Sequence, residues 1–229
     1  MSFEKLRLKN IEETKQKIRA SVKKDILLIQ ATHSLEELAK SLNQLTEALR
    51  KHYELYLPEI SKIIQDPQIF IKTISKPKNQ LIKEYNIKDT LGIELKEKDL
   101  EILKDYINEI TILYKLEGNL TKYIENLAKE IAPNLSKEAQ PLLASKLLAL
   151  AGSLKNLAFM PSSKLQLLGA EKAFFRHLKN KKKYKSPKYG IIYNHQLIQT
   201  SKEKGKAARH LASKLTIATR KDYFKRWKK

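Results

Sequence analysis

Two groups of cationic side chains in the last third of the chain are spaced so that they can bind a polyanion together. Lys172, Arg176 and Lys179 recur at gaps of four and three, so on a helix they share one face. A second group follows further along the chain and consists of Lys204, Lys206, Arg209 and Lys214. Residues 158–229 hold 20 Lys/Arg and 3 Asp/Glu, whereas residues 1–157 hold 26 and 22. Most of the formal net charge of +21 therefore lies in one segment, which indicates a polyanionic partner.

The segment that follows Lys202 has the pattern of a helix with two different faces. At about 100° per residue, its leucines and most of its alanines gather on one side and its cations on the other. Ile217 is the one apolar residue on the cationic side. The carboxylates that intersperse an ordinary solvated face are nearly absent, so we expect this face to bind a polyanion.

An aromatic and amide cluster lies between the two cationic groups. It consists of Tyr189, Tyr193, Asn194 and His195. The short apolar run Gly190–Ile192 within it is expected to be extended. Aromatic rings and amides beside cations suit stacking on an unpaired base, with hydrogen bonds to the edge of that base. For His195 the sequence leaves a structural role and an RNA contact open.

The sequence lacks the motifs of several enzyme classes. It has no Gly-x-Gly-x-x-Gly and no Walker-type loop, and it has no Cys. Its five His are scattered, so neither a cofactor nor a metal is expected. The basic segment holds only three carboxylates, and Glu171 among them is expected to stabilise a helix N-terminus. We predict a protein that is not an enzyme. Its apolar runs are too short to span a bilayer. Binding to an acidic membrane surface would need large exposed apolar side chains opposite the cations, but that face is mostly Ala and Leu of packing size, so no membrane partner is expected.

The first part of the chain has the periodicity of helices. Ser34 and Glu37 fit a capping box, and the apolar seam that follows them continues to Pro58. A long helix is predicted over Glu97–Ile131, and its single apolar stripe needs a partner helix. We therefore expect a long antiparallel helical hairpin, a coiled coil. Whether it also packs on a second chain to form a homodimer is left open.

A second domain is predicted after the long helix. Pro133 ends that helix, and Pro141 suits the first position of another. The segment from Pro141 to Ala158 is apolar nearly all round and is expected to be one buried helix. The sequence thus predicts an all-α protein. A coiled-coil domain would cover residues 1–132, and a compact helical RNA-binding domain would cover residues 133–229.

The second half carries a series of motifs: Ala132–Leu135, Leu148–Leu154, Met160–Ser163, Leu168–Lys172, Pro187–Tyr193, Lys204–Arg209 and Asp222–Phe224. With these motifs the chain closely resembles the Nop domain family, the RNA-binding scaffold of box C/D ribonucleoproteins. Tyr53–Glu59 resembles part of the coiled-coil domain of that family. The resemblance therefore covers nearly the whole chain.

The resemblance implies several partners. Family members bind a kink-turn RNA together with a small kink-turn-binding protein that resembles a ribosomal protein. Archaeal members also hold the methyltransferase fibrillarin through an N-terminal domain. The 33 residues before Ser34 are too few for such a domain. This chain is therefore expected to be a trimmed form or a shorter paralogue, which would recruit fibrillarin only through a missing or separate domain.

The resemblance also indicates which residues face RNA. With Lys214 from the cationic face, the predicted RNA-binding residues are Lys172, Arg176, Lys179, Asn194, His195, Lys204, Lys206, Arg209 and Lys214. Asn194 occupies the place where a spliceosomal relative has a base-stacking His. Stacking there is expected to be weaker or to involve a neighbouring residue.

We therefore predict a non-catalytic scaffold that binds kink-turn box C/D RNA jointly with the small protein. It would support assembly of the RNA 2′-O-methylation complex and thereby rRNA processing. The alternative is a Nop-domain paralogue that binds another kink-turn ribonucleoprotein without recruiting the methyltransferase. The lack of a long Lys-rich tail favours an archaeal, cytoplasmic protein, whereas a eukaryotic one would be nuclear or nucleolar. The RNA itself cannot be named from the sequence.

Overall fold

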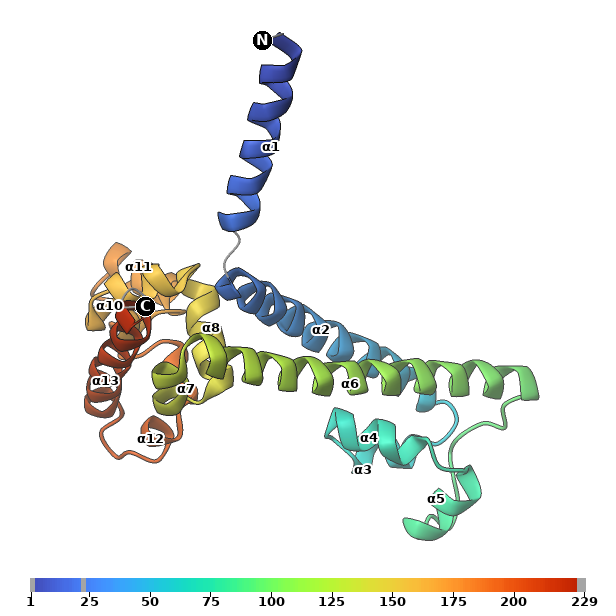
Figure 1. The fold of residues 1–229 in the computed structure, drawn as a ribbon. Helices are drawn as coiled ribbons and strands as arrows, with labels where there is room; N and C mark the ends of the chain where they lie inside the picture. The colour runs from blue at the N-terminus through green and yellow to red at the C-terminus, as the bar shows by residue number, and fades with distance from the viewer. Residues whose placement is uncertain (1–2, 22–23, 226–229) are drawn as a thin grey trace. The chain divides into compact units, whose positions relative to one another are not determined.

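A computed structural model describes residues 3–21 and 24–225, and every regular element in these residues is a helix. The all-α prediction is thereby confirmed. The chain forms two compact units (Figure 1). Unit 1 comprises residues 1–33 and 123–229, and unit 2 comprises residues 34–122. No described helix has the length and apolar character needed to cross a membrane.

Unit 2 is built around two long helices, α2 (Lys24–Tyr53) and α6 (Glu97–Ile131), each of which continues into unit 1. Within unit 2 they run in opposite directions (Figure 1). The Thr46 hydroxyl lies 3.3 Å from the Tyr114 hydroxyl, and the Tyr106 hydroxyl donates to the Leu45 carbonyl at 3.4 Å. The predicted apolar seam supplies the shared core, with Leu42, Leu49, Leu103, Ile107 and Ile110 buried. A coiled-coil dimer stays a prediction.

The predicted start of the first long helix at Ser34 is wrong. Helix α2 begins at Lys24 and passes through Ser34 without a break. Leu28 and Ile29 are buried upstream of Ser34, so apolar packing extends the helix by about three turns beyond the local capping signal. The bounds predicted for α6, by contrast, are those observed.

Three short helices complete unit 2: α3 (Pro58–Ile63), α4 (Pro67–Ile74) and α5 (Lys78–Glu84). Proline opens both α3 and α4, where its missing N–H costs no hydrogen bond. Arg50 of α2 donates to the Ser61 and Ile64 carbonyls at 2.8 and 2.6 Å, and its guanidinium lies 4.1 Å from the centre of the Phe70 ring. These contacts join the end of α3 to α2.

Unit 1 combines helix α1 (Phe3–Ser21), the start of α2 and the end of α6 with the C-terminal helices. The latter are α7 (Pro133–Ala139), α8 (Pro141–Ala151), α9 (Leu154–Phe159), α10 (Ser162–Leu167), α11 (Glu171–Lys179), η1 (Ile191–Asn194), α12 (Gln196–Gln199) and α13 (Lys204–Lys225). Helix α13 packs against α7, α9, α10 and α12. It is therefore the central element of this unit.

The single buried helix predicted from Pro141 to Ala158 is in fact two helices, α8 and α9. Gly152 ends α8 with φ +78°, a left-handed conformation that side chains with a Cβ rarely adopt. Ser153 then caps α9 by accepting a hydrogen bond from the Asn156 amide at 3.0 Å. The predicted burial is correct, since Leu147, Leu148, Leu154 and others lie in the core.

Asp222 joins the two ends of the C-terminal region. It is only 4% exposed, and its carboxylate accepts hydrogen bonds from the backbone amides of Asn134 at 3.0 Å and Leu135 at 2.8 Å. These amides belong to the first turn of α7, where N–H groups have no partner within the helix. The carboxylate of α13 therefore caps α7 and carries a negative charge to its positive end.

The compact units do not follow the domains predicted from the sequence. Residues 1–33 and the last turns of α6 belong to the same unit as α7 to α13. In unit 1 the buried carboxylate of Asp25 accepts a hydrogen bond from the Leu154 amide at 3.2 Å. The division into domains at residues 132 and 133 stays a prediction, because compactness does not test which part folds independently.

Replacing Asp222 by Asn tests whether the buried carboxylate stabilises unit 1. Asp222→Asn keeps the shape of the side chain but removes its charge, and it can turn an NH₂ group towards backbone amides that need an acceptor. We expect a loss of about 2 kcal/mol in the free energy of unfolding. Chemical denaturation of the full chain would measure it, with exposed Glu203→Gln as the matched control. Equal midpoints for the two variants would contradict the capping role.

Candidate RNA-binding surface

Helix α13 has the two faces that its sequence predicted. Ala208, Leu211, Ala212 and Leu215 are buried. On the other side the cations are exposed, and so is Ile217 at 56%. The exposed cations of this face are Lys206, Arg209, His210, Lys214, Arg220 and Lys221. The two-faced helix is thus confirmed, and the packing of α13 turns its charges to solvent.

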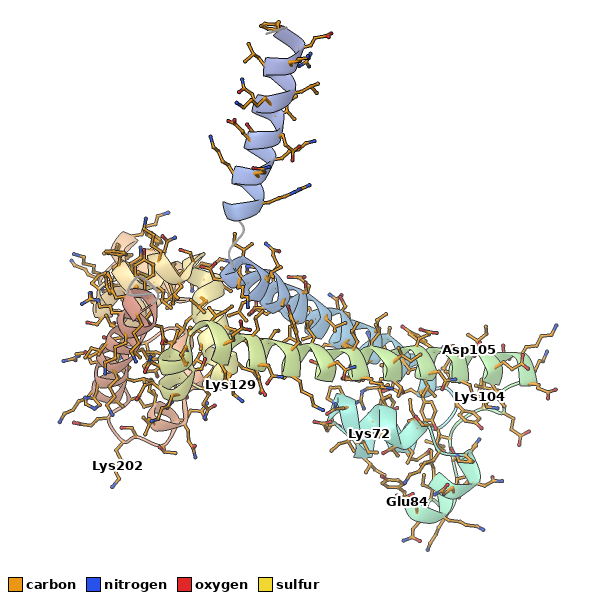
Figure 2. All side chains as sticks on the ribbon, viewed as in Figure 1. Lys72, Glu84, Lys104, Asp105, Lys129 and Lys202 are labelled. Atoms are coloured by element: carbon orange, nitrogen blue, oxygen red, sulfur yellow. The ribbon has the colours of Figure 1, made fainter. Side chains whose placement is uncertain are left out.

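A basic groove lies at the N-terminal end of α13. It encloses about 910 Å³ and is lined by Gln166, Lys185–Tyr189, Lys202–Lys206 and Arg209. The groove has six cationic side chains but one carboxylate, that of Glu203, which lies 3.4 Å from the Lys206 ammonium group. Figure 2 shows Lys202 projecting outwards from the loop that precedes α13. The positive end of the α13 dipole adds to the attraction for an anion.

The wall of the basic groove formed by residues 185–190 is held in place by backbone hydrogen bonds. The amides of Gly190 and Ile191 donate to the carbonyls of Gln166 and Leu168, both at 2.8 Å. The Gln166 side chain donates to the Lys188 carbonyl at 2.6 Å. A Cβ at Gly190 would overlap the Leu168 carbonyl oxygen, so only glycine fits there. This close approach holds Lys188 and Tyr189 next to the start of α13.

A stacked aromatic pair lies at the edge of the basic groove. The rings of Tyr189 and Tyr193 are 4.8 Å apart and nearly parallel, at 14°. The Lys204 ammonium group donates to the Tyr193 hydroxyl at 3.2 Å and lies 5.2 Å from the centre of that ring. The predicted neighbourhood of aromatic rings and cations is therefore present. Both tyrosines are half-exposed, so part of the pair faces solvent.

The other two members of the predicted cluster have different surroundings. The run expected to be extended forms the 3₁₀ helix η1 at Ile191–Asn194, because Ile192 turns into the core. Asn194 is exposed, whereas His195 is only 8% exposed. The His195 Nδ1 accepts from the Leu197 amide at 3.2 Å, and Nε2 lies 3.0 Å from the Glu138 carbonyl. A neutral ring with its proton on Nε2 satisfies both bonds, so His195 caps α12. Because both ring nitrogens of His195 have partners, neither is free to contact a base.

Helix α11 carries the first cationic group, and Lys172, Arg176 and Lys179 are all exposed on it. The Arg176 guanidinium lies 5.8 Å from the centre of the Tyr184 ring. The expected structural role of Glu171 is supported, since its carboxylate accepts from the Gly169 amide at 2.8 Å. No residue of α11 is buried. Two apolar side chains of α11 are also open to solvent, Phe175 at 66% and Leu178 at 47%.

The structure thus brings together only some of the predicted site residues. Lys204, Lys206 and Arg209 line the basic groove, while the cations of α11 and Lys214 lie on exposed faces outside it. Sequence reasoning missed Lys185, Lys188 and Lys202 as members of the groove. The lysine-rich run and the motif from Pro187 signalled their charge, but their convergence on α13 depends on the path of the loop. In the described part of the chain, His, Asp and Glu side chains form no metal-binding cluster.

Comparison with known proteins identifies the family. The model of the Nop family, described as a snoRNA binding domain and fibrillarin, matches residues 34–229. The chain belongs to the Nop family. The Nop match includes both the basic groove and the whole of unit 2.

Relatives of this Nop protein occur in archaea and eukaryotes. A NOP5 family protein of Methanocaldococcus jannaschii is 40% identical over 93% of this chain and 56% of its own length. Nucleolar protein 58 of Schizosaccharomyces pombe is 37% identical over 87% of this chain and 43% of its own. The crystal structure of a fibrillarin/Nop5p complex superposes with a TM-score of 0.56 and 27% identity, covering 94% of this chain and 66% of that one. The chain spans about half the length of these curated relatives.

The structural role of His195 can be separated from RNA binding. His195→Ala removes both the α12 cap and the hydrogen bond to Glu138, so we expect the free energy of unfolding to fall by about 1–2 kcal/mol. Binding to non-specific RNA should change less than twofold. Asn194→Ala is the matched control, because it alters an exposed neighbour without either bond. Thermal denaturation and an RNA titration of both variants would decide, and unchanged stability of His195→Ala would refute the capping role.

Proposed function

We propose that this Nop protein is a non-catalytic scaffold that binds kink-turn RNA of the box C/D type jointly with a small kink-turn-binding protein. The observation that carries the proposal is the basic groove, which gathers six cations and the α13 N-terminus beside a stacked tyrosine pair. The family description names snoRNA binding, which supports RNA as the polyanion. No catalytic family is among the matches, so the proposed role is assembly.

The groove suits the sugar-phosphate backbone better than base edges. Half of its lining residues carry ammonium or guanidinium groups, which neutralise phosphates without reading sequence. The Tyr189–Tyr193 pair and the exposed Asn194 amide are the groups nearby that can stack on an unpaired base or hydrogen-bond to it. We therefore infer that Lys204, Lys206 and Arg209 supply affinity and that the tyrosine pair supports one unstacked base.

Helix α11 is proposed as the contact for the small protein. It joins exposed Lys172, Arg176 and Lys179 with exposed Phe175 and Leu178, and nothing in its own unit buries it. A surface with cations next to exposed apolar side chains fits a partner that presents both RNA and protein. RNA and small protein would then form one composite surface against unit 1.

The proposal also includes support for assembly of the RNA 2′-O-methylation complex. The structural neighbour is a complex with fibrillarin, and the family description also names fibrillarin, which supports its presence in the same assembly. In the alternative, this chain is a paralogue that binds another kink-turn ribonucleoprotein. It would then use the same basic groove, and no observation of the structure favours this alternative separately. The names of the eukaryotic relatives place those proteins in the nucleolus. For an archaeal protein the cytoplasm remains our prediction.

The salt dependence of RNA binding tests the role of the groove. If about five phosphates are neutralised, log K should fall with log salt at a slope of about −3.5 to −4.5. Changing Lys204 and Arg209 to Ala should make the slope shallower by about 1.4–1.8. Lys72→Ala with Lys115→Ala, two exposed cations of unit 2, is the matched control. Titration of a kink-turn RNA at several salt concentrations measures this, and a flat response would refute the proposal.

The composite surface predicts cooperative assembly. Binding to a kink-turn RNA should be at least about tenfold tighter, or about 1.4 kcal/mol, when the small protein is already bound to it. Phe175→Ser with Leu178→Ser should remove most of this gain but leave binding to naked RNA unchanged. Changing Lys206 and Arg209 to Ala should weaken both. Gel-shift titrations with and without the small protein would show it, and equal affinity in the two cases would leave only a basic RNA-binding groove.

A further inference from the structure

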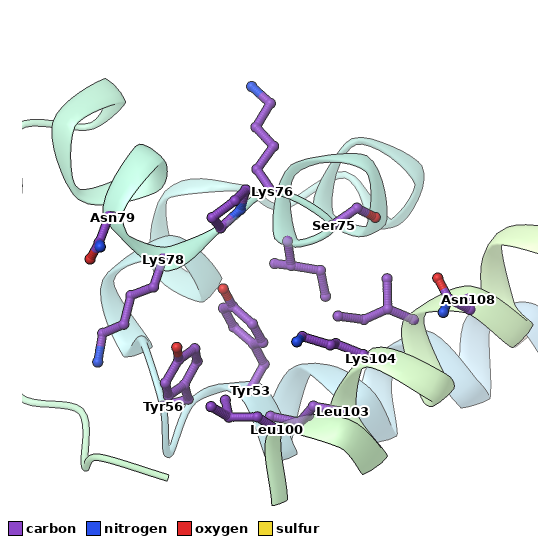
Figure 3. A pocket seen from close by; sticks show the side chains of 13 residues that line it. Tyr53, Tyr56, Ser75, Lys76, Lys78, Asn79, Leu100, Leu103, Lys104 and Asn108 are labelled. Carbon is purple, nitrogen blue, oxygen red and sulfur yellow. The ribbon is translucent and has the colours of Figure 1, made fainter. Parts of the chain in front are cut away.

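Unit 2 contains a cavity that the proposed RNA-binding role does not use. It encloses about 590 Å³ between the end of α2, the α4–α5 connection and the first turns of α6. Figure 3 shows Tyr53, Tyr56, Lys78 and Lys104 around the same space. We refer to it as the unit 2 cavity. Its volume is larger than a single phosphate or carboxylate requires and is typical of sites that take a short segment or a small molecule.

The charge of the unit 2 cavity is positive and only partly compensated. Three lysines line it, Lys76, Lys78 and Lys104, and no carboxylate does. Lys76 is neutralised by Glu84 at 2.7 Å. Lys78 lies 4.3 Å from the centre of the Tyr56 ring, and neither it nor Lys104 forms an ion pair with any described carboxylate. Two ammonium groups are therefore available to an anionic ligand.

The hydroxyl group of Tyr53 is also available in the cavity. Tyr53 is only 3% exposed, and its ring packs edge-on against Tyr56 and Phe70. Its hydroxyl has no hydrogen-bond partner among the described residues, although the side chain lines the cavity. Burial raises the pKa of the Tyr53 phenol, so the group stays neutral and keeps its proton to donate. A hydroxyl that faces the cavity can donate a hydrogen bond to an acceptor on a ligand.

The rest of the lining suits a peptide. Ile74, Leu100, Leu103 and Ile107 form an apolar wall, and the Asn79 and Asn108 amides can hydrogen-bond to a backbone. Unit 2 as a whole has 14 Lys/Arg and 15 Asp/Glu, against 32 and 10 in unit 1. Glu101 and Asp105, which are exposed, also lie on the same helix as Lys104. This nearly neutral balance gives unit 2 far less long-range attraction for an extended polyanion than unit 1 has, so the two available lysines of its cavity suit a short acidic segment.

We propose that the unit 2 cavity binds a short acidic peptide segment of a partner protein. An apolar side chain of the segment would pack on the Ile74–Leu103–Ile107 wall. Flanking carboxylates would pair with Lys78 and Lys104, and one acceptor of the segment would accept a hydrogen bond from the Tyr53 hydroxyl. This site is independent of the RNA-binding groove, because the two lie in different units.

An array of fluorescein-labelled ten-residue peptides tests the proposal on the full chain. Each peptide places one Leu, Ile or Phe among Asp and Glu at varied positions, and a second set replaces the acids by Asn and Gln. Acidic members should bind, and Lys78→Glu with Lys104→Glu should weaken the best of them at least about tenfold. Lys72→Glu with Lys115→Glu is the matched control, because it makes the same charge change outside the cavity. Any attraction of the peptides to unit 1 affects both variants equally.

Tyr53→Phe separates ligand binding from folding. It removes a hydroxyl without a partner and keeps the ring, so thermal stability should be unchanged while affinity for the best peptide falls about threefold or more. Equal binding by the two double variants would overturn the proposal, as would equal binding of the acidic and neutral sets. A ten-nucleotide uridine oligonucleotide that loses affinity only with Lys78→Glu and Lys104→Glu would assign the cavity to RNA instead. Kink-turn RNA binding measured in parallel reports separately on the groove of unit 1.

Discussion

The contact between Asp222 and the start of α7 joins α13 to the rest of unit 1, and the basic groove depends on the position of α13. A segment with very few acidic residues uses one of them inside the protein, where its charge meets the unpaired amides of Asn134 and Leu135. A buried carboxylate is costly unless hydrogen bonds compensate it, so it specifies one packing of α13. With Asp222 turned inwards, helical geometry places Lys206, Arg209 and Lys214 on the outer face.

The loop that faces α13 is fixed by a different constraint, the close approach of Gly190 to the α10–α11 connection. Lysines on a loop repel one another and would not hold a concave arrangement by themselves. The backbone hydrogen bonds of Gly190 and Ile191 provide that arrangement. Hydrogen bonds between neutral amide and carbonyl groups therefore fix the loop that carries two of the lysines of the groove. The ammonium groups of Lys185, Lys188 and Lys202 take part in no described ion pair and are not needed to stabilise the loop, so they are available to an anion.

The two units divide the charge of the chain between them. Unit 1 has a large excess of Lys/Arg, whereas Asp/Glu slightly outnumber Lys/Arg in unit 2. RNA would consequently be drawn to unit 1, since long-range attraction follows net charge. The lysines of the unit 2 cavity lie near carboxylates, so they attract an anion only over a short range. A scaffold with such a division can bind RNA through one unit and a protein segment through the other.

The sequence by itself determined the helical class, the bounds of α6, the two faces of α13 and the family. The first three follow from local periodicity and composition, and the family follows from the resemblance of its motifs; none of them needs knowledge of distant contacts. Only the tertiary structure decided where α2 begins, because Leu28 and Ile29 are buried in unit 1 and override the capping signal at Ser34. It also decided that His195 caps α12, since the carbonyl that it meets belongs to Glu138. The membership of Lys185, Lys188 and Lys202 in the groove likewise depends on a loop held by Gln166 and Leu168. Contacts between residues far apart in the chain fix these features, and no local pattern records such contacts.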